Sequence, residues 1–319
     1  MIEILYIFLI SFFVAYVSIP SIVTISNLKN LYDKPNERNS HINATPTLGG
    51  LAIYAGLVLS LSLFCELKEL RFIIASMTVI FFTGLKDDIL VISPIKKTLG
   101  QIISGVILIY FLILLLINSY NLIDGIDGLS SGVGIITSST FAIWFFLNGE
   151  FGYSMIGLSL AGTLMAFFRF NVFSKKKKIF MGDTGSLLVG LIIYILTVKF
   201  NEINIDGEHG ISSAPALSFA ILIIPLIDTL RIFLIRAINK KSPFKPDKNH
   251  IHHNLLDFGF SHLQVTTIIL FCNLIFIILA FYSSIYLKNL GTSILFFIFI
   301  ISGFLLSFLP KYMKNKKNL

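Results

Sequence analysis

The amino-acid sequence predicts an all-α, polytopic integral membrane protein. Its 319 residues are 55% hydrophobic and only 13% charged, and the mean hydropathy is +0.85. A soluble protein of this size carries about a quarter charged residues. The apolar residues fall in blocks that approach the roughly 17 to 25 residues needed to cross a hydrocarbon core of about 30 Å. The alternating ten-residue segments of a membrane β-barrel are absent, so we expect helices.

About ten candidate spans follow one another along the chain. We find neither an internal repeat nor a low-complexity region, so residues 1–319 are predicted to form a single domain. The candidate at 72–85 is short and is expected to extend in both directions. In order, the candidates are 2–25, 48–64, 72–85, 102–118, 132–148, 153–172, 185–200, 214–236, 264–287 and 290–310.

The linkers between these spans sort by charge. Four linkers and the C-terminal tail are basic, and one of them contains the run "KKKK", whereas residues 201–213 ("NEINIDGEHGISS") carry carboxylates and no Lys or Arg. The positive-inside rule therefore places the basic linkers in the cytoplasm and residues 201–213 outside. The net charge of +8 is explained by this topology, and no basic-aromatic surface indicates nucleic-acid binding.

This topology contains a conflict near residues 101–120. A single crossing at 102–118 would carry the chain from the basic linker 86–100, which is inside, to the outside. Counting back from the "KKKK" linker over two spans places the same point inside. Either one apparent span does not cross the membrane, or the chain lacks a crossing in this region.

Two clusters of carboxylates stand at span ends in linkers assigned to the cytoplasm. Asp87 and Asp88 of "GLKDD" repel each other unless a cation or a proton is shared. In "NLIDGIDGL", Asn121 precedes Asp124 and Asp127, which are three apart and would share one face of a helix. A solvated helix end would explain the first cluster, but an ordinary helix cap needs only one of the acids in the second.

Two further clusters combine acids, amides and cations. Asp183 lies in "FMGDTGS" just before a span, where a helix N-terminus binds anions, although it would also serve as a simple cap. Asn171 and four lysines precede it and offer donors and charge to a phosphate. The loop "NHIHHNLL" contains His250, His252 and His253 without an accompanying Cys or Glu, so phosphate contact is favoured over zinc or a structural role.

Together these residues predict a site for phosphoryl transfer at one membrane face. Carboxylate oxygens suit Mg²⁺, which binds through one or two carboxylates and the phosphates of the substrate. Cationic side chains would neutralise the charge of the transferred group. The position at the membrane surface indicates one soluble phosphorylated substrate and one lipid substrate.

The ordered motifs resemble the polyprenyl-phosphate N-acetylhexosamine-1-phosphate transferases. They are "FTGLKDDILVISPIKKTLGQ", "NLIDGIDGL", "FMGDTGSLLVG", "PLIDTLRIFLIR" and "PDKNHIHHNLLDFG", and the resemblance runs from about Asp33 to Gly259. It implies transfer of a sugar-1-phosphate from a UDP-sugar to polyprenyl phosphate, with release of UMP. It also implies Mg²⁺, with Mn²⁺ as a substitute, and a site facing the cytoplasm from the inner membrane. The "HIHH" form favours UDP-GlcNAc or a close relative, and the resemblance leaves room for a homodimer.

The resemblance also implies roles for individual residues. Asp87 and Asp88 match the aspartate pair near the lipid phosphate, Asp183 matches the metal-binding aspartate, and Asn121 belongs to the nucleotide-side motif. The predicted catalytic residues are Asp87, Asp88, Asp183, His252 and His253. Asp183 is also the predicted metal ligand. The predicted substrate-binding residues are Lys97, Asn121, Asp124, Asp127, Asn171 and His250.

The chain departs from this family where its topology is in conflict. Members usually have about eleven spans, with two crossings between "KKTLGQ" and the Asn-x-x-Asp motif, whereas only Ile102–Tyr120 separates these motifs here. Nineteen helical residues reach about 28 Å, enough for one crossing but not for two. If this segment spans, Asp124 and Asp127 lie about 30 Å from Asp183 and activity is lost. A re-entrant segment would instead return Asn121 to the inner face.

Two other functions remain open at this point. A transporter would use membrane-embedded acids, but such acids line a path in mid-span, and here they lie at span ends. An aromatic prenyltransferase is also a Mg²⁺-dependent membrane enzyme, but it would leave the histidine loop unexplained.

Overall fold

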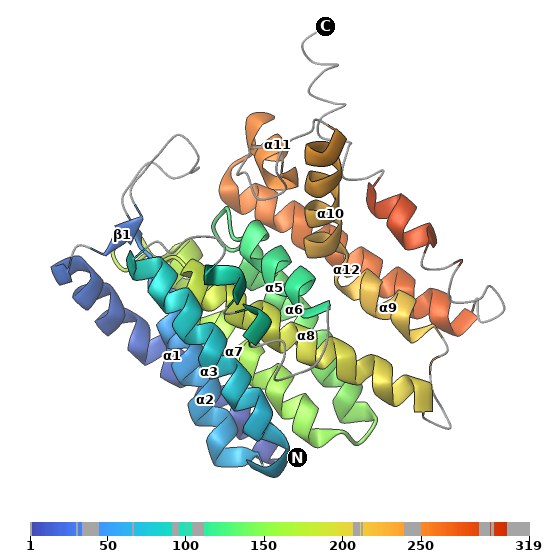
Figure 1. Cartoon of the computed structure of the whole chain (residues 1–319), viewed down its shortest axis with the longest axis horizontal. Helices are drawn as coiled ribbons and strands as arrows, with labels where there is room; N and C mark the ends of the chain where they lie inside the picture. The colour runs from blue at the N-terminus through green and yellow to red at the C-terminus, as the bar shows by residue number, and fades with distance from the viewer. Residues whose placement is uncertain are drawn as a thin grey trace, which may run out of the picture. The chain divides into compact units, whose positions relative to one another are not determined.

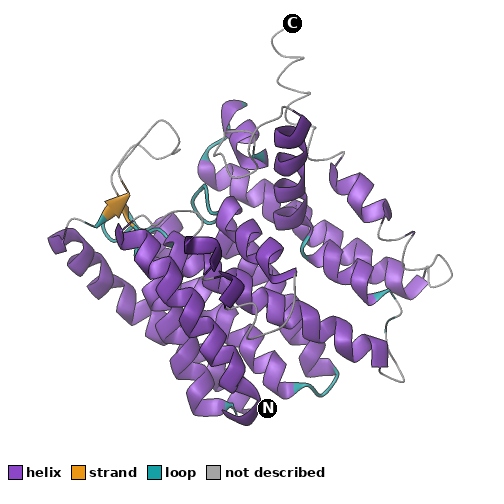
Figure 2. Cartoon of the chain, viewed as in Figure 1, coloured by secondary structure: helices purple, strands orange, loops and turns teal. Residues whose placement is uncertain are grey.

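The computed structural model confirms an all-α membrane architecture. Apart from one pair of two-residue strands, the regular elements of the described residues are all helices (Figure 2). Residues 2–29, 31–33, 45–65, 67–90, 96–99, 101–103, 112–206, 211, 213–238, 250–286, 294 and 297–304 are described.

The described residues group into two compact units. Apart from residues 37–39, the first runs to Leu196 and the second begins at Thr197, within one long helix. The prediction of a single domain stays a prediction. The first unit contains α1 (Ile2–Lys29), β1 (Tyr32–Asp33), β2 (Thr45–Pro46), α2 (Gly49–Phe64), α3 (Leu67–Leu90), α5 (Leu112–Ile123), α6 (Leu129–Leu147), α7 (Phe151–Phe173) and most of α8 (Gly182–Asp206). The second contains the end of α8, α9 (Ala214–Ile221), α10 (Ile223–Ile238), α11 (Ile251–Asp257) and α12 (His262–Tyr286).

In the first unit, α1, α2, α6 and α7 pack through small residues. Helix α7 contacts the other three, and α1 and α2 lie side by side (Figure 1). Gly162 of α7 lies against the backbone of α1, because a Cβ atom there would meet the Phe8 carbonyl oxygen at 2.6 Å. Ser60 of α2 and Ser159 of α7 share a hydrogen bond of 2.5 Å. Small and hydroxyl side chains allow this close approach where lipid supplies no hydrophobic driving force between helices.

Among the described residues, five helices are long and apolar enough to cross a membrane. A sixth candidate is the pair α9 and α10, which is bent by 81°. The chain is therefore a multi-pass membrane protein, but the predicted number of about ten spans is not confirmed. Helix α3 extends the candidate at 72–85 in both directions, as expected, and most of 290–310 lies outside the described residues. The five helical segments are Glu3–Lys29, Leu129–Leu147, Phe151–Phe173, Gly182–Asn204 and His262–Tyr286.

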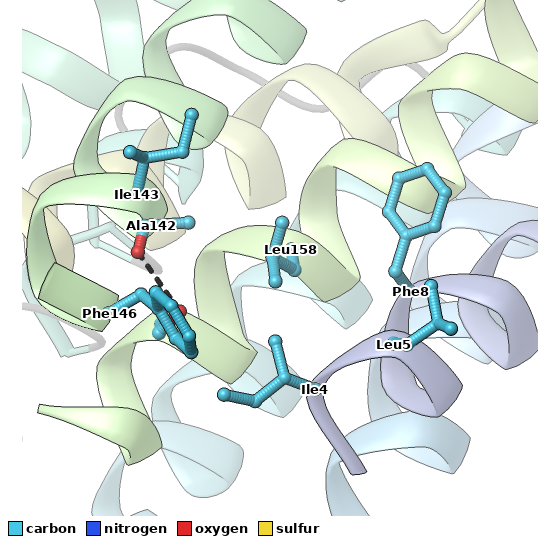
Figure 3. Close-up of a pocket in the computed structure, with 8 residues that line it drawn as sticks. Ile4, Leu5, Phe8, Ala142, Ile143, Phe146 and Leu158 are labelled. Atoms are coloured by element: carbon cyan, nitrogen blue, oxygen red, sulfur yellow. Dashed lines mark hydrogen bonds between the residues drawn. The ribbon is translucent and has the colours of Figure 1, made fainter. Parts of the chain in front are cut away.

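An apolar hollow of about 390 Å³ lies between α1, α6 and α7. Ile4, Ile143, Phe146 and Leu158 line it, and the Ser154 hydroxyl donates a hydrogen bond of 2.9 Å to the Ala142 carbonyl (Figure 3). The α6 residues of the hollow begin thirteen positions after the start of that helix, or about 20 Å along it. The hollow is thus remote from the polar residues that precede α6, and its lining offers no reactive group.

We predict that Gly162→Ala destabilises the protein. The added methyl group would overlap the backbone of α1, and overpacking of this kind costs about 1–3 kcal/mol. Gly152→Ala in the same helix is the matched control, because a Cβ atom at Gly152 meets nothing within 4 Å. Alanine there is expected to leave the thermal midpoint unchanged or raise it, since Ala is the better helix former. Thermal unfolding in detergent measures both, and equal midpoints would contradict the close contact of α1 and α7.

Candidate functional site

The start of α8 is held by backbone hydrogen bonds to the segment that leads into α2. The N–H of Phe180 donates to the Pro46 carbonyl at 2.7 Å, and the N–H groups of Gly49 and Gly50 donate to the carbonyls of Phe180 and Met181, both at 2.9 Å. Gly182 then turns the chain into the helix with φ at 68°, a conformation that glycine adopts without strain. The predicted metal ligand therefore stands on a fixed backbone.

Asp88 at the end of α3 caps this helix. Its Oδ1 accepts the N–H of Asp183 at 2.7 Å, and its Oδ2 accepts both the N–H of Thr184 at 3.0 Å and the Thr184 hydroxyl at 2.6 Å. A carboxylate stabilises a helix N-terminus by satisfying these N–H groups and by its charge. Both oxygens of Asp88 are thus engaged with α8, while its predicted catalytic role stays a prediction.

Lys97 connects Asp87 and Asp183. Its Nζ lies 3.1 Å from Asp87 Oδ2 and also forms an ion pair with Asp183 Oδ2. Burial by itself lowers the pKa of Lys97, but the two carboxylates outweigh it and hold that pKa above its ordinary value. The lysine therefore stays charged and places one positive charge between two acids. Two residues predicted to be catalytic and one predicted to bind substrate meet here.

Asn121 brings the "NLIDGIDGL" motif to the same point. Its Nδ2 donates to Asp183 Oδ1 at 2.6 Å and to Ser186 Oγ at 2.9 Å. The motif is therefore not stranded on the opposite side from Asp183. Ser186 was not predicted to take part, and its only signal in the sequence is its place three residues after Asp183.

A second contact shows how the segment before Asn121 brings that residue back to the site. The side-chain amides of Gln101 and Asn118 exchange hydrogen bonds of 3.3 Å, although a straight helix would separate these residues by about 25 Å. Helix α5 has twelve residues, or about 18 Å, too short for a hydrocarbon core of about 30 Å. Residues 104–111 lie outside the described range. The two ends of the segment lie together, as the re-entrant alternative requires.

Asp124 and Asp127 do not lie on one helix face. Helix α5 ends at Ile123, and residues 124–128 form turns before α6, with Gly128 at φ 77°. The shared face that their spacing would give on a helix therefore does not form, because glycine in a left-handed conformation separates α5 from α6. Asp127 forms an ion pair of 2.5 Å with Lys178, the last lysine of the "KKKK" run.

Asn171 at the end of α7 links two backbone segments. Its Oδ1 accepts the N–H of Gly128 at 2.7 Å, and its Nδ2 donates to the Ile179 carbonyl at 2.8 Å. Asn171 is buried, with 5% of its surface exposed. The structure thus shows a residue that holds the Asp124–Gly128 turn against the chain before α8, and its predicted substrate contact stays a prediction.

The carboxylates outnumber their lysine partners. Burial, together with the charges of Asp183, Asp88 and Asp127, raises the pKa of Asp124 to about 8. Five aspartates take part in this network, whereas the described ion pairs supply only Lys97 and Lys178. This excess of carboxyl groups favours either a bound cation or, at Asp124, a bound proton. No set of three or more His, Cys, Asp or Glu side chains in the described ranges forms a metal-ligand cluster, so a bound Mg²⁺ would need oxygens from substrate phosphates.

The three histidines cluster in the second unit. The ring of His250 stacks on that of His252 at 5.4 Å and 14°, and the rings of His252 and His253 lie 4.4 Å apart. His250 Nδ1 lies 2.6 Å from Asp228 Oδ2 in α10. Asp228 was not among the predicted site residues, although its place as a lone carboxylate in the apolar run "PLIDTLRIF" is a signal in the sequence. That the histidines and the carboxylates share one membrane face stays a prediction.

We predict that cysteines at positions 121 and 186 can be cross-linked by a short bismaleimide. The Asn121 and Ser186 side chains are in contact, whereas a spanning segment would separate them by about 30 Å. The background is Cys65→Ala and Cys272→Ala, because both native cysteines are free. The control pair joins Ser186→Cys to Asn148→Cys, at the far end of α6 and about 28 Å along that helix. Cross-linking of the control alone would refute the arrangement.

We also predict that Asp124 makes stability depend on pH. A carboxyl whose pKa is raised on folding stabilises the protein fully below about pH 4, the unfolded value, and this contribution is lost as the pH rises through about 8. The thermal midpoint of Asp124→Asn should therefore gain on that of the unaltered protein between pH 4 and 8 and then keep a constant difference. The measurement is made in EDTA so that no metal ion screens the carboxylates. A difference that does not change with pH would contradict the raised pKa.

Comparison with known proteins agrees with the ordered motifs. The family model described as glycosyl transferase family 4 matches residues 103–201. "Probable undecaprenyl-phosphate N-acetylglucosaminyl 1-phosphate transferase" of Bacillus subtilis is 30% identical over 339 residues, covering 96% of this chain and 91% of the relative. "Decaprenyl-phosphate N-acetylglucosaminephosphotransferase" of Mycolicibacterium smegmatis is 28% identical over 289 residues, covering 74% and 71%. "Undecaprenyl-phosphate alpha-N-acetylglucosaminyl 1-phosphate transferase" of Escherichia coli is 27% identical over 271 residues, covering 75% and 72%.

The Bacillus subtilis alignment is longer than the chain itself. It has 339 positions, whereas 96% of 319 residues is about 306, so about 33 positions of the relative have no counterpart here. The absence of one crossing with its loop would account for a difference of this size. Similarity over nearly the whole length, together with the matching model, establishes that the chain belongs to glycosyl transferase family 4, the family of the polyprenyl-phosphate N-acetylglucosamine-1-phosphate transferases.

Proposed function

We propose that the protein transfers N-acetylglucosamine-1-phosphate from UDP-GlcNAc to a polyprenyl phosphate and releases UMP. The observation that carries this proposal is that three motifs meet at Asp183. Its side chain contacts Lys97 of the first motif and Asn121 of the second, and its backbone N–H donates to Asp88, also of the first motif. The named relatives act on undecaprenyl or decaprenyl phosphate. We place the site at the cytoplasmic face of the inner membrane, following the basic linkers.

We further propose that the reaction depends on Mg²⁺. The excess of carboxylates around Asp183 fits a divalent cation, and Asp183 is the residue that would hold it together with substrate phosphates. When bound, the cation would neutralise the charge of the bridging phosphates. Mn²⁺ has the same preference for carboxylate oxygens and would serve as a substitute.

The residues of the chain have distinct parts in this proposal. Lys97 provides a fixed positive charge for a phosphate oxygen, since its pKa is held high by its two acidic neighbours. Asn121 orients Asp183 by donating a hydrogen bond to Oδ1. Lys178 is held by Asp127 at the turn of the nucleotide-side motif. Because catalysis of phosphoryl transfer is mostly positioning and charge neutralisation, these side chains need only hold the two substrates in line.

The short segment before Asn121 is compatible with activity in this proposal. The contact of Gln101 with Asn118 returns the chain to the site, so the loss of activity expected for a spanning segment is not expected. A transporter is disfavoured because the acids lie at helix ends and in turns. An aromatic prenyltransferase is disfavoured by the family match. A homodimer stays a prediction.

We predict that the purified protein with UDP-GlcNAc, undecaprenyl phosphate and Mg²⁺ forms labelled lipid and an equal amount of UMP. EDTA should abolish both products, and Mg²⁺ should restore them. Asp183→Asn keeps the size of the side chain but removes its charge, and we expect a loss of at least about 100-fold.

The matched control is Glu202→Gln, since Glu202 is exposed and pairs only with Lys199 among the described ion pairs. This variant should retain full activity. UMP release without labelled lipid would show hydrolysis rather than transfer, and absence of both products with the unaltered protein would refute the proposed function. Product with UDP-GalNAc and not with UDP-GlcNAc would keep the reaction and correct the sugar.

A further inference from the structure

Asp228 is a buried carboxylate in the second unit that the proposed reaction does not use directly. It lies in α10 and is 2% exposed. Its Oδ2 is 2.6 Å from Nδ1 of His250, and its Oδ1 accepts the N–H of Ile251 at 2.9 Å. A buried charge is costly unless it is paired and hydrogen-bonded. Asp228 has both kinds of partner at the entry to α11, where the three histidines lie.

The two bonds determine the orientation of the His250 ring. An ionised carboxylate only accepts hydrogen bonds, so the proton must be on Nδ1 of His250. Nε2 is then the nitrogen available to another group. The bond to Ile251 fixes the backbone beside the ring, so the imidazole has little freedom to rotate or to change tautomer.

Stacking against the fixed ring of His250 also orients the ring of His252. Its ring lies nearly parallel to that of His250, with an interplanar angle of 14°. His252 is 2% exposed, and its Nε2 has no hydrogen-bond partner in the described part of the chain. A buried ring nitrogen without a partner normally costs free energy, so its presence beside an oriented imidazole indicates a place for a ligand oxygen.

We propose that Asp228 is a positioning residue for the histidine cluster. It holds the proton of His250 on Nδ1 and directs Nε2, which is then a hydrogen-bond acceptor, toward a sugar hydroxyl of the donor substrate. This inference rests on the proposed function for the identity of the ligand. Its geometric part concerns the tautomer of His250 and is testable without any substrate.

The first test is spectroscopic. The protein is labelled with ¹⁵N-histidine in lipid nanodiscs, and the His250 signals are identified by their loss in His250→Gln. We expect the Nδ1–H form in the unaltered protein. Asp228→Asn should shift His250 toward the Nε2–H form, because an amide nitrogen cannot accept the Nδ1 proton and the amide oxygen is occupied by Ile251. An Nε2–H form in the unaltered protein, or no change in the variant, would overturn the inference even where the transferase assay succeeds.

The second test is a double-mutant cycle on transferase activity. Replacing the carboxylate partner of a functional histidine costs about 10- to 100-fold, and we expect such a loss for Asp228→Asn. If Asp228 acts through His250, the double variant Asp228→Asn/His250→Gln should lose no more than His250→Gln alone. Losses that multiply would show a separate structural role and overturn the proposal.

The matched control is Asp257→Asn at the other end of α11, where the side chain is exposed. It should retain activity and the Nδ1–H signal of His250. Thermal midpoints of all variants are compared, so that a loss of folding in Asp228→Asn is recognised and the tautomer is then assigned in Asp228→Glu, which keeps the acceptor. Absence of activity in the unaltered protein with an intact Nδ1–H signal would refute the proposed function and leave the positioning role standing.

Discussion

The site of the first unit depends on the carboxylate of Asp88 at the first turn of α8. This one side chain accepts three hydrogen bonds from Asp183 and Thr184 and thereby joins the end of α3 to the start of α8. The contact is so close that a Cβ atom at Gly84 would meet the Thr184 backbone at 2.5 to 2.6 Å, and one at Gly182 would meet Asp88 Oδ2 at 2.6 Å. Glycine at both positions is a steric requirement of the cap. Because Asp183 is fixed in this way, Lys97 and Asn121 can approach it from other elements without moving it.

The contact between Asn121 and Asp183 also requires a particular path for the short segment before Asn121. Asn121 reaches Asp183 only if the segment that precedes it begins and ends in the same place. The hydrogen bonds between the side-chain amides of Gln101 and Asn118 show that its two ends lie together. Exposed backbone within lipid is costly, so irregular segments at membrane depth are tolerated where protein surrounds them. Here Gln101 is 2% exposed, and Ser119 and Tyr120 are fully buried. The Gln101 amide is therefore buried within the protein, and its two hydrogen bonds with Asn118 satisfy it there.

The sequence was sufficient to predict the class of fold and most of the carboxylate site, because long apolar blocks and acids at their ends carry direct physical signals. The sequence could not predict which partner each of these acids contacts. Asp88 and Asp87 are adjacent and chemically identical, yet one caps α8 and the other faces Lys97, and only the path of α3 separates these roles. The turn at 124–128 brings Gly128 so close to Phe168 and Val172 that a Cβ atom there would meet them at 2.8 and 2.7 Å, and no local pattern in the sequence shows such contacts. Asp228 was passed over because its partner His250 is 22 residues away in sequence.

The two units differ in how their buried carboxylates are paired, and the difference determines which group in each unit is left for a ligand to satisfy. Around Asp183, the carboxylates of the described residues exceed the lysines in their described ion pairs, so a cation from a substrate complex would complete the charge balance. Around Asp228, the single carboxylate is already matched by His250 and Ile251, and the unsatisfied group is a ring nitrogen of His252. Each unit, taken by itself, therefore leaves a different kind of group for a ligand to satisfy, which is a set of carboxylates in the first unit and a buried ring nitrogen in the second.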